Sequence, residues 1–200
     1  LAAPAINPIV VVSTLVAFPG QPEIAMARVL ASMAVAMLVG WIWLRLGKES
    51  WLRLKGSHGN QGQSRTMIFV NSAAHDLVHA GGYLVVGAGF AAAFNTLVPV
   101  QVLDSIAGQV LLSVFVLALM AAILSICSEA DAFVAASFTS FSPTAKLAFM
   151  VVGPMVDLKL IAMQAGVFGR SFAVRFAPLV FGLAVIVSLV VGSVLLGSAS

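Results

Sequence analysis

Acidic and thiol side chains gather in one short segment, Cys127-Ser128-Glu129-Ala130-Asp131, that follows a long apolar run. An ionisable side chain within a membrane is energetically costly, so such residues are candidates for a solute or ion pathway. A cysteine thiolate is also a soft ligand that suits a soft metal or metalloid. We therefore expect Cys127, Ser128, Glu129 and Asp131 to line a pathway.

The same segment also has a purely structural interpretation. Ser128 and Asp131 have the S-x-x-D spacing of a capping box, with Ser128 as the N-cap and Asp131 at the third helical position. In this alternative Asp131 only caps the following helix, and Cys127 is an inert small hydrophobic residue. Glu129 is not needed for the cap, so it stays a pathway candidate in either case.

A second group of candidates is Pro154, Asp157 and Lys159. A proline removes one backbone donor and frees a carbonyl one turn earlier in a helix. Freed backbone groups beside a broken helix are what transporters use to bind ions and substrates. Asp157 and Lys159 are two positions apart and do not face each other on a helix. We expect both at the pathway; the alternative is a solvated hairpin end.

A third group is His75, Asp76 and His79, in which the histidines lie one helical turn apart. That spacing can hold a metal ion or relay protons. The alternative is a solvated first turn of a helix with Asp76 as the N-cap. An intramembrane metalloenzyme built on these residues is one rival hypothesis, and a non-transporting scaffold subunit is another. No other enzyme motif is evident, and we expect neither enzymatic activity nor a cofactor.

The composition determines where these residues must lie. The chain has 200 residues, of which 61% are hydrophobic and 8% charged, with a mean hydropathy of +1.10. A soluble domain has about 25% charged residues, so a soluble enzyme, a nucleic-acid-binding module and a disordered chain are excluded. A single cysteine excludes an intrachain disulfide. Because only helices and closed barrels satisfy the backbone in lipid, we predict an all-α polytopic transmembrane bundle.

Four segments are long and apolar enough to cross a bilayer: 24–44, 76–98, 105–127 and 172–197. The polar segment 45–65 is expected in the cytoplasm by the positive-inside rule, because it carries half of the cations, namely Arg45, Lys48, Arg53, Lys55 and Arg65. Segments 1–18 and 128–168 are apolar but are interrupted by prolines and, in the second case, charges. We expect 128–168 to enter and return, as a re-entrant hairpin or a pair of crossings.

Residues 1–9 (LAAPAINPI) resemble residues 151–159 (VVGPMVDLK), with Pro4 matching Pro154 and Asn7 matching Asp157. After each copy come a glycine turn, an arginine and a long apolar span, and the predicted orientations of these spans are opposite. Broken inverted repeats that meet near the midplane are a hallmark of secondary transporters. We expect Pro4, Pro8 and Pro154 to break the helices, and Asn7 to approach Asp157.

These boundaries divide the chain into the end of a first repeat (1–44), a linker (45–65) and a second repeat (66–200). About one and a third repeats fit in 200 residues. We therefore expect a fragment lacking an N-terminal half, or a half-transporter that forms a homodimer.

Four strings carry a family resemblance: LAAPAINPIVVVSTLVAFPG (from Leu1), GGYLVVGAGFAAAFNTLVP (from Gly81), LSICSEADAFVAASF (from Leu124) and LAFMVVGPMVDLKLIAMQAGVFGRSF (from Leu147). They resemble the bacterial predicted-permease family that includes the trivalent organoarsenical (methylarsenite) efflux permeases. The resemblance implies a multi-pass permease of the bacterial inner membrane with about twice this architecture. Its usual cysteine-containing N-terminal half is absent here, and family members often have an acidic residue in place of His79.

The expected function is a permease that moves a small solute or ion across the lipid bilayer by alternating access. The resemblance suggests a metalloid, metal or oxyanion species as the solute. No nucleic-acid partner is expected.

Overall fold

The computed structural model describes residues 6–46 and 107–197, together with six isolated positions between them, 67, 70, 74, 85, 89 and 93. The two described segments form helices and contain no strand. Three helical stretches are long and apolar enough to cross a membrane: Pro22–Arg45, Pro143–Val167 and Arg170–Leu195. The described residues therefore confirm the all-α membrane bundle. Almost all of the predicted span 76–98, apart from positions 85, 89 and 93, and almost all of the 45–65 linker lie outside the described residues.

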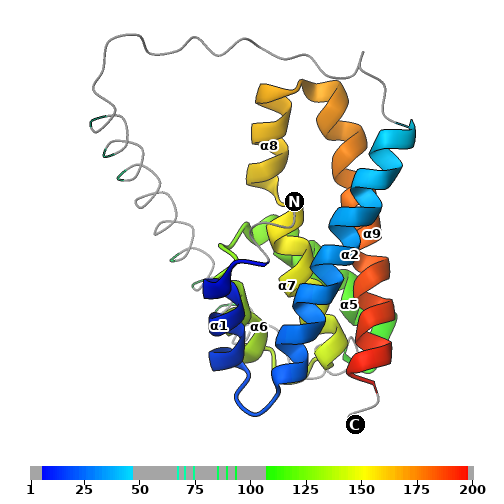
Figure 1. Ribbon diagram of the computed structural model, residues 1–200. Coiled ribbons are helices and arrows are strands. Elements are labelled where there is room, and N and C mark those ends of the chain that lie inside the picture. The colour runs from blue at the N-terminus through cyan, green and yellow to red at the C-terminus, as the bar shows by residue number, and fades with distance from the viewer. Residues whose placement is uncertain are drawn as a thin grey trace.

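The two longest helices are α2 (Pro22–Leu46) and α9 (Arg170–Leu195). Pro22 suits the first turn of α2 because that turn needs no backbone donor there, and Glu23 complements its positive end. Trp43 of α2 packs edge-on against Phe172 of α9, with ring centroids 4.9 Å apart. The end of α2 and the start of α9 thus lie together, at what we call the upper end of the bundle (Figure 1).

Helices α5 (Val110–Leu124) and α6 (Asp131–Ser137) are joined by a short turn. α5 stops at Ser125, whose φ of 49° is left-handed, and a turn over residues 125–130 sends the chain back. In Figure 1, α6 then descends beside α1 toward the lower end of the bundle. The helix in the predicted span 105–127 is thus shorter than expected, at Val110–Leu124.

The next segment is one long apolar helix interrupted in its middle. α7 (Pro143–Met155) begins at Ser142, whose side chain accepts a hydrogen bond from the Ala145 N–H, as the Ser-Pro dipeptide predicts. The helix breaks just after Pro154, and α8 (Leu158–Val167) follows. Residues 143–167 together have the length and composition of a single crossing. The re-entrant hairpin or pair of crossings expected over 128–168 stays a prediction.

Helix α7 forms the centre of the core. Every residue from Thr144 to Met155 except Lys146 is buried, and α7 packs against α5 and α9. The approach to α9 is close at Gly192, where a Cβ atom would lie only 2.8 Å from Thr144 Oγ1. A glycine at this position lets the two helices touch, which is how small residues act in membrane bundles.

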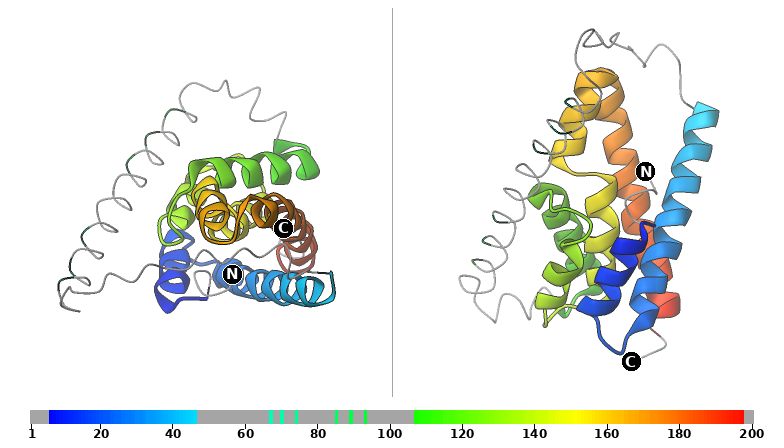
Figure 2. Two further views of the ribbon diagram at one scale, coloured as in Figure 1. Left: turned by 90° about the horizontal axis from the view of Figure 1, so that it is seen from above. Right: turned by 60° about the vertical axis from the view of Figure 1, so that its left-hand side comes forward.

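Two helical hairpins point in opposite directions. α1 (Pro8–Ala17) runs to a turn at residues 18–21 and then into α2, while α8 runs to a turn at residues 168–169 and then into α9. The first turn lies at the lower end of the bundle and the second at the upper end (Figures 1 and 2). Each turn contains a glycine with positive φ, Gly20 at 80° and Gly169 at 95°, a conformation that other residues rarely adopt.

Candidate functional site

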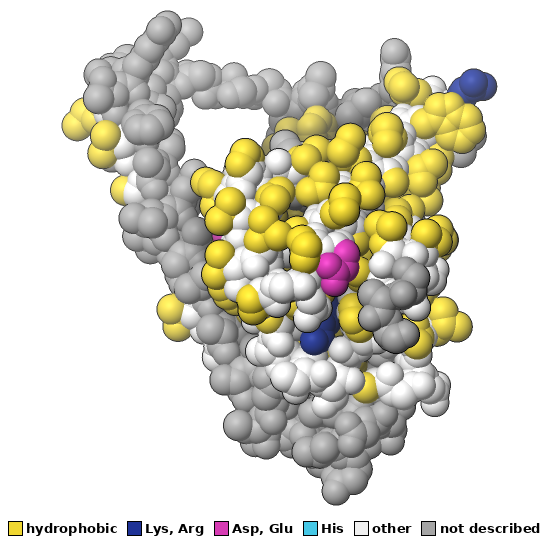
Figure 3. Space-filling view, turned by 60° about the horizontal axis from the view of Figure 1, so that its bottom comes forward, with side chains coloured by type: hydrophobic (Ala, Val, Ile, Leu, Met, Phe, Trp, Pro, Cys, Tyr) yellow, Lys and Arg dark blue, Asp and Glu magenta, His cyan; other side chains and the backbone are white. Residues whose placement is uncertain are grey.

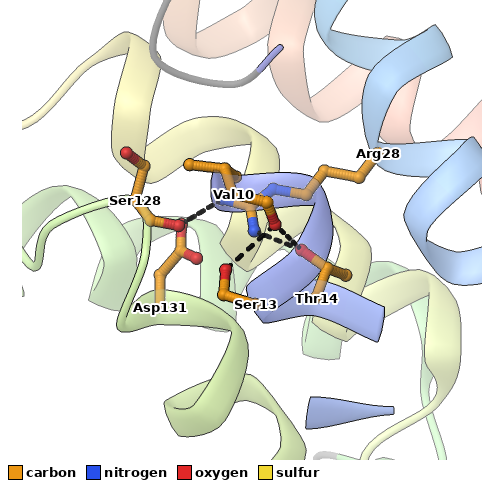
Figure 4. A network of polar contacts seen from close by, with 6 residues as sticks. All are labelled: Val10, Ser13, Thr14, Arg28, Ser128 and Asp131. Carbon is orange, nitrogen blue, oxygen red and sulfur yellow. Dashed lines mark hydrogen bonds and ion pairs between the residues drawn. The ribbon is translucent and has the colours of Figure 1, made fainter. Parts of the chain in front are cut away.

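A buried ion pair joins three helices in the interior of the bundle. Arg28, on α2, is 1% exposed, and its Nη2 donates to Asp131 Oδ2 at 2.7 Å. The same nitrogen donates to the Ser128 carbonyl at 3.0 Å, and Nη1 donates to Thr14 Oγ1 at 2.8 Å. Figure 4 shows the guanidinium of Arg28 between α1 on one side and the Ser128–Asp131 turn on the other.

Local structure holds each partner of Arg28 in place. The Thr14 hydroxyl donates to the Val10 carbonyl one turn earlier in α1, at 2.7 Å, and therefore presents its oxygen to the arginine. The Cys127 carbonyl accepts hydrogen bonds from the Ala130 and Asp131 N–H groups. This turn brings Asp131 to the start of α6, where its carboxylate points back to α2 (Figure 4).

The pair is incompletely satisfied. Arg28 Nε and Asp131 Oδ1 are both buried, and neither has a hydrogen-bond partner. Removing two charges from water is expensive, and their mutual attraction offsets that cost only when the remaining polar atoms are also satisfied. The site thus keeps one donor and one acceptor without partners in an apolar interior.

The capping-box interpretation is wrong for Ser128 and Asp131. α6 begins at Asp131 itself, Ala130 occupies the N-cap position, and no side chain caps the helix. Asp131 binds an arginine 103 residues away in sequence instead, because a charged partner stabilises a buried carboxylate more than a backbone N–H does. Glu129 and Cys127 are both half-buried in the same turn. Their predicted pathway roles remain predictions.

Asn7 and Asp157 both act as N-caps. Asn7 Oδ1 accepts from the Ile9 N–H at 3.1 Å, and Asp157 Oδ1 accepts from the Leu160 N–H at 2.6 Å. Each caps its own helix, and their predicted approach to each other stays a prediction. Pro154 precedes a helix break as expected, but Pro8 occupies the first turn of α1 and starts a helix instead of breaking one.

The caps make a testable contribution to stability. We expect Asp157→Ala to lower the free energy of unfolding by about 1 kcal/mol because the Leu160 N–H loses its acceptor. Asp157→Asn keeps an acceptor oxygen and is the matched control. Thermal unfolding in detergent measures both variants, and equal losses for the two would contradict the capping role.

The other predicted site residues fall into two groups. Lys159 is exposed on α8. Pro4, His75, Asp76 and His79 lie outside the described residues. Within the part of the chain that the structure describes, no three acidic, cysteine or histidine side chains are grouped to hold a metal ion.

Two cavities open at the lower end of the bundle. One of about 560 Å³ is lined by residues that include Glu23, Ser142 and Thr144. The other, of about 240 Å³, is lined by residues that include Phe18 and Lys146. Gln21, Ile24 and Pro143 border both. Figure 3 views the molecule with this end turned forward; hydrophobic side chains dominate the surface, with few charged groups among them.

Sequence reasoning did not find Arg28 as a member of the site. It interpreted Arg28 only as the arginine that follows the glycine turn of the first repeat. The available signal was its place as the seventh residue of a long apolar helix, where an arginine needs a partner. The identity of that partner depends on the turn between α5 and α6, which the sequence pattern does not specify.

Comparisons with known proteins agree with this architecture. The profile of a family described as "Predicted permease" matches residues 1–193. The chain is 34% identical over 179 residues to UPF0718 protein YcgR of Bacillus subtilis, covering 86% of the chain and 61% of that protein. It is 31% identical over 198 residues to a Streptococcus mutans protein, covering 95% of the chain and 66% of that protein.

The Streptococcus mutans relative is named as a subunit of a two-component membrane permease complex. The chain spans about two thirds or less of the length of these relatives. No protein of known structure matches it. From the profile match over nearly its whole length, the chain belongs to the predicted permease family.

Proposed function

We propose that this chain forms the greater part of a membrane permease that moves a small solute by alternating access. Arg28 and Asp131 lie at the proposed joint, by which we mean the contact between the α1–α2 hairpin and the Ser128–Asp131 turn. The buried ion pair is the observation that supports this most directly. Family membership and the permease-named relative support the general class. The joint and the mechanism are our inference from the geometry.

The position of the pair supports a mechanical role. Arg28 belongs to the α1–α2 hairpin, while Ser128 and Asp131 belong to the turn between α5 and α6. A buried ion pair adds little net stability compared with apolar residues of similar volume. Its presence in an apolar bundle is explained if the transport cycle breaks and remakes it, so that the α1–α2 hairpin moves relative to α6.

The opposed hairpins support alternating access. α1 and α8 have the same length, each begins at a polar N-cap, and each leads through a glycine turn into a long helix. We interpret α1–α2 and α8–α9 as inverted copies of one unit, an arrangement that lets a transporter face either side of the membrane in turn. The upper end, where α2 ends and α9 begins with Arg170, is assigned to the cytoplasm by the positive-inside rule.

The solute proposed from the family resemblance is a small metalloid, metal or oxyanion species. Glu129 and Asp157 are proposed as polar groups on its route, and the cavities beside Glu23 and Lys146 as its entrance. A partner subunit is proposed from the name of the Streptococcus mutans relative.

Transport in vesicles tests the proposed joint. We expect the neutral double variant Arg28→Met/Asp131→Leu to fold, because an apolar pair can replace a buried ion pair, yet to lose at least tenfold in uptake. The experiment uses protein from its complete reading frame in proteoliposomes, with arsenite, methylarsenite and sulfate as probe solutes. Arg175→Gln, at an exposed position of α9, is the control and should transport normally.

Three outcomes would contradict parts of this proposal. Wild-type uptake by the double variant would leave the ion pair with a structural role only. Normal uptake by both Glu129→Gln and Asp157→Asn would remove these residues from the route. Failure of the wild-type protein to move any of the three probes would contradict the proposed solute class.

A further inference from the structure

The two cavities at the lower end of the bundle differ in the sign of their charge. Among the described residues, Glu23 is the only charged side chain that lines the cavity of about 560 Å³. Lys146 is likewise the only charged side chain among those that line the cavity of about 240 Å³. The two cavities share Gln21, Ile24 and Pro143 and therefore adjoin. A carboxylate and an ammonium group thus stand on either side of a shared wall.

Neither charge is neutralised within the part of the chain that the structure describes. Both side chains are half-buried, and neither forms an ion pair or a hydrogen bond with another described residue. Glu23 complements the positive end of α2, as an acidic residue in a first turn does. Lys146 has no such local reason, because it is the fourth residue of α7 and lies near the positive end of that helix. A half-buried cation there needs a negative partner, which a bound ligand can supply.

The remaining lining supplies weaker polar groups. Ser142 and Thr144, which carry hydroxyl groups, border the Glu23 cavity. Gln21, in the shared wall, carries an amide that can both donate and accept hydrogen bonds. The helix ends around the Lys146 cavity contribute partial charges of both signs, negative from α1 and α6 and positive from α7. Among the described residues, a ligand therefore meets one full negative and one full positive charge. Figure 3 shows both an acidic and a basic side chain on this face.

We propose that the adjoining cavities bind a small zwitterion, with its ammonium group beside Glu23 and its acid group beside Lys146. The larger cavity has the size of a small-molecule site, which is about 300–1,000 Å³. An inorganic anion would leave Glu23 without a partner, and a metal cation would leave Lys146 without one, so neither would use the whole site. This ligand is distinct from the solute proposed above, and its site does not depend on the joint at Arg28 and Asp131.

Binding to the full-length protein tests this site. Isothermal titration calorimetry in detergent uses glycine, 4-aminobutanoate and 6-aminohexanoate, which differ in the separation of their charges, with acetate and methylammonium as singly charged controls. We expect one of the zwitterions to bind about tenfold more tightly than either control, because it gains a second charge-assisted contact. Glu23→Gln and Lys146→Gln should each weaken that binding about tenfold for the same reason. Arg175→Gln, at an exposed position of α9, is the control and should bind normally.

Several results would overturn the proposal. Binding of no zwitterion would do so, as would equal binding of a zwitterion and a singly charged control. Wild-type affinity in both neutral variants would mean that the two charges play no part in binding. If Glu23 and Lys146 only paired with each other, both neutral variants would melt at a lower temperature and no zwitterion would bind.

Two further measurements keep the test decisive. If a neutral variant does not fold, Glu23→Asp and Lys146→Arg keep each charge but alter its reach, so they should change which of the three zwitterions binds best. An unchanged preference would count against the site. Uptake separates this proposal from the previous one: a zwitterion that binds to a protein unable to move arsenite, methylarsenite or sulfate would support this site and contradict only the proposed solute class.

Discussion

Arg28→Met is expected to lower the free energy of unfolding by about 3–5 kcal/mol, which is the usual cost of leaving one charge of a buried pair without its partner. Asp131 is 2% exposed within the bundle, so in this variant its carboxylate would be buried against methionine with no guanidinium beside it. Thr14 and the Ser128 carbonyl lose their donors as well. Thermal unfolding in detergent, followed by circular dichroism, measures the loss.

Two further variants separate charge from packing. Asp131→Asn removes the negative charge but keeps an acceptor oxygen for Arg28, so we expect a loss of similar sign that is smaller than for Arg28→Met. The double variant Arg28→Met/Asp131→Leu should recover most of the stability, since it leaves neither charge uncompensated. A double variant as unstable as Arg28→Met would mean that the guanidinium stabilises the fold through Thr14 and Ser128 and not through Asp131.

Gly192→Ala is expected to destabilise the protein by about 1–3 kcal/mol, as overpacking of a close interface does. The added Cβ would lie 2.9 Å from Thr144 Cβ and 2.8 Å from Thr144 Oγ1, and closer still to Thr144 Cγ2. Both residues are buried where α7 meets α9, so relief requires the two helices to separate. Thermal unfolding again provides the measurement.

Gly182→Ala is the matched control for this prediction. Gly182 lies on the same helix, and a Cβ there meets nothing within 4 Å. Because alanine favours a helix over glycine by up to about 1 kcal/mol, this variant should be neutral or slightly stabilising. Thr144→Ala combined with Gly192→Ala should recover part of the loss. Equal effects of the two glycine substitutions would show that packing at Thr144 is not the cause.

The sequence predicted the fold class, and the predicted spans 24–44 and 172–197 lie within two residues of α2 and α9 at each end. Pro22 and Glu23 indicate the start of α2, and Ser142-Pro143 indicates the start of α7; both helices begin there. These signals are local, because a cap or a first-turn proline acts on backbone groups within one turn. The apolar runs were equally informative, since a long apolar segment in lipid forms a helix to satisfy its own backbone hydrogen bonds.

The turn at Ser125 was not predicted from the sequence, for a physical reason. Residues 105–127 are mostly apolar, and hydropathy does not show where a helix ends within such a run. The turn at Ser125 depends on protein that surrounds the irregular backbone and on a partner for Asp131, both of which come from distant parts of the chain. Pro8 shows the same limit at smaller scale, since a proline can either end a helix or begin one.

By itself, the sequence determined that this chain is a helical membrane protein with a partly repeated pattern of N-caps, glycine turns and long spans. Composition and local caps suffice for that conclusion, because they act through short-range backbone chemistry and transfer from water to lipid. Only the tertiary structure decided which charges meet. Arg28 and Asp131 are 103 residues apart, and the cost of burying each charge is a property of the pair, which exists only once α1, α2 and α6 have packed together.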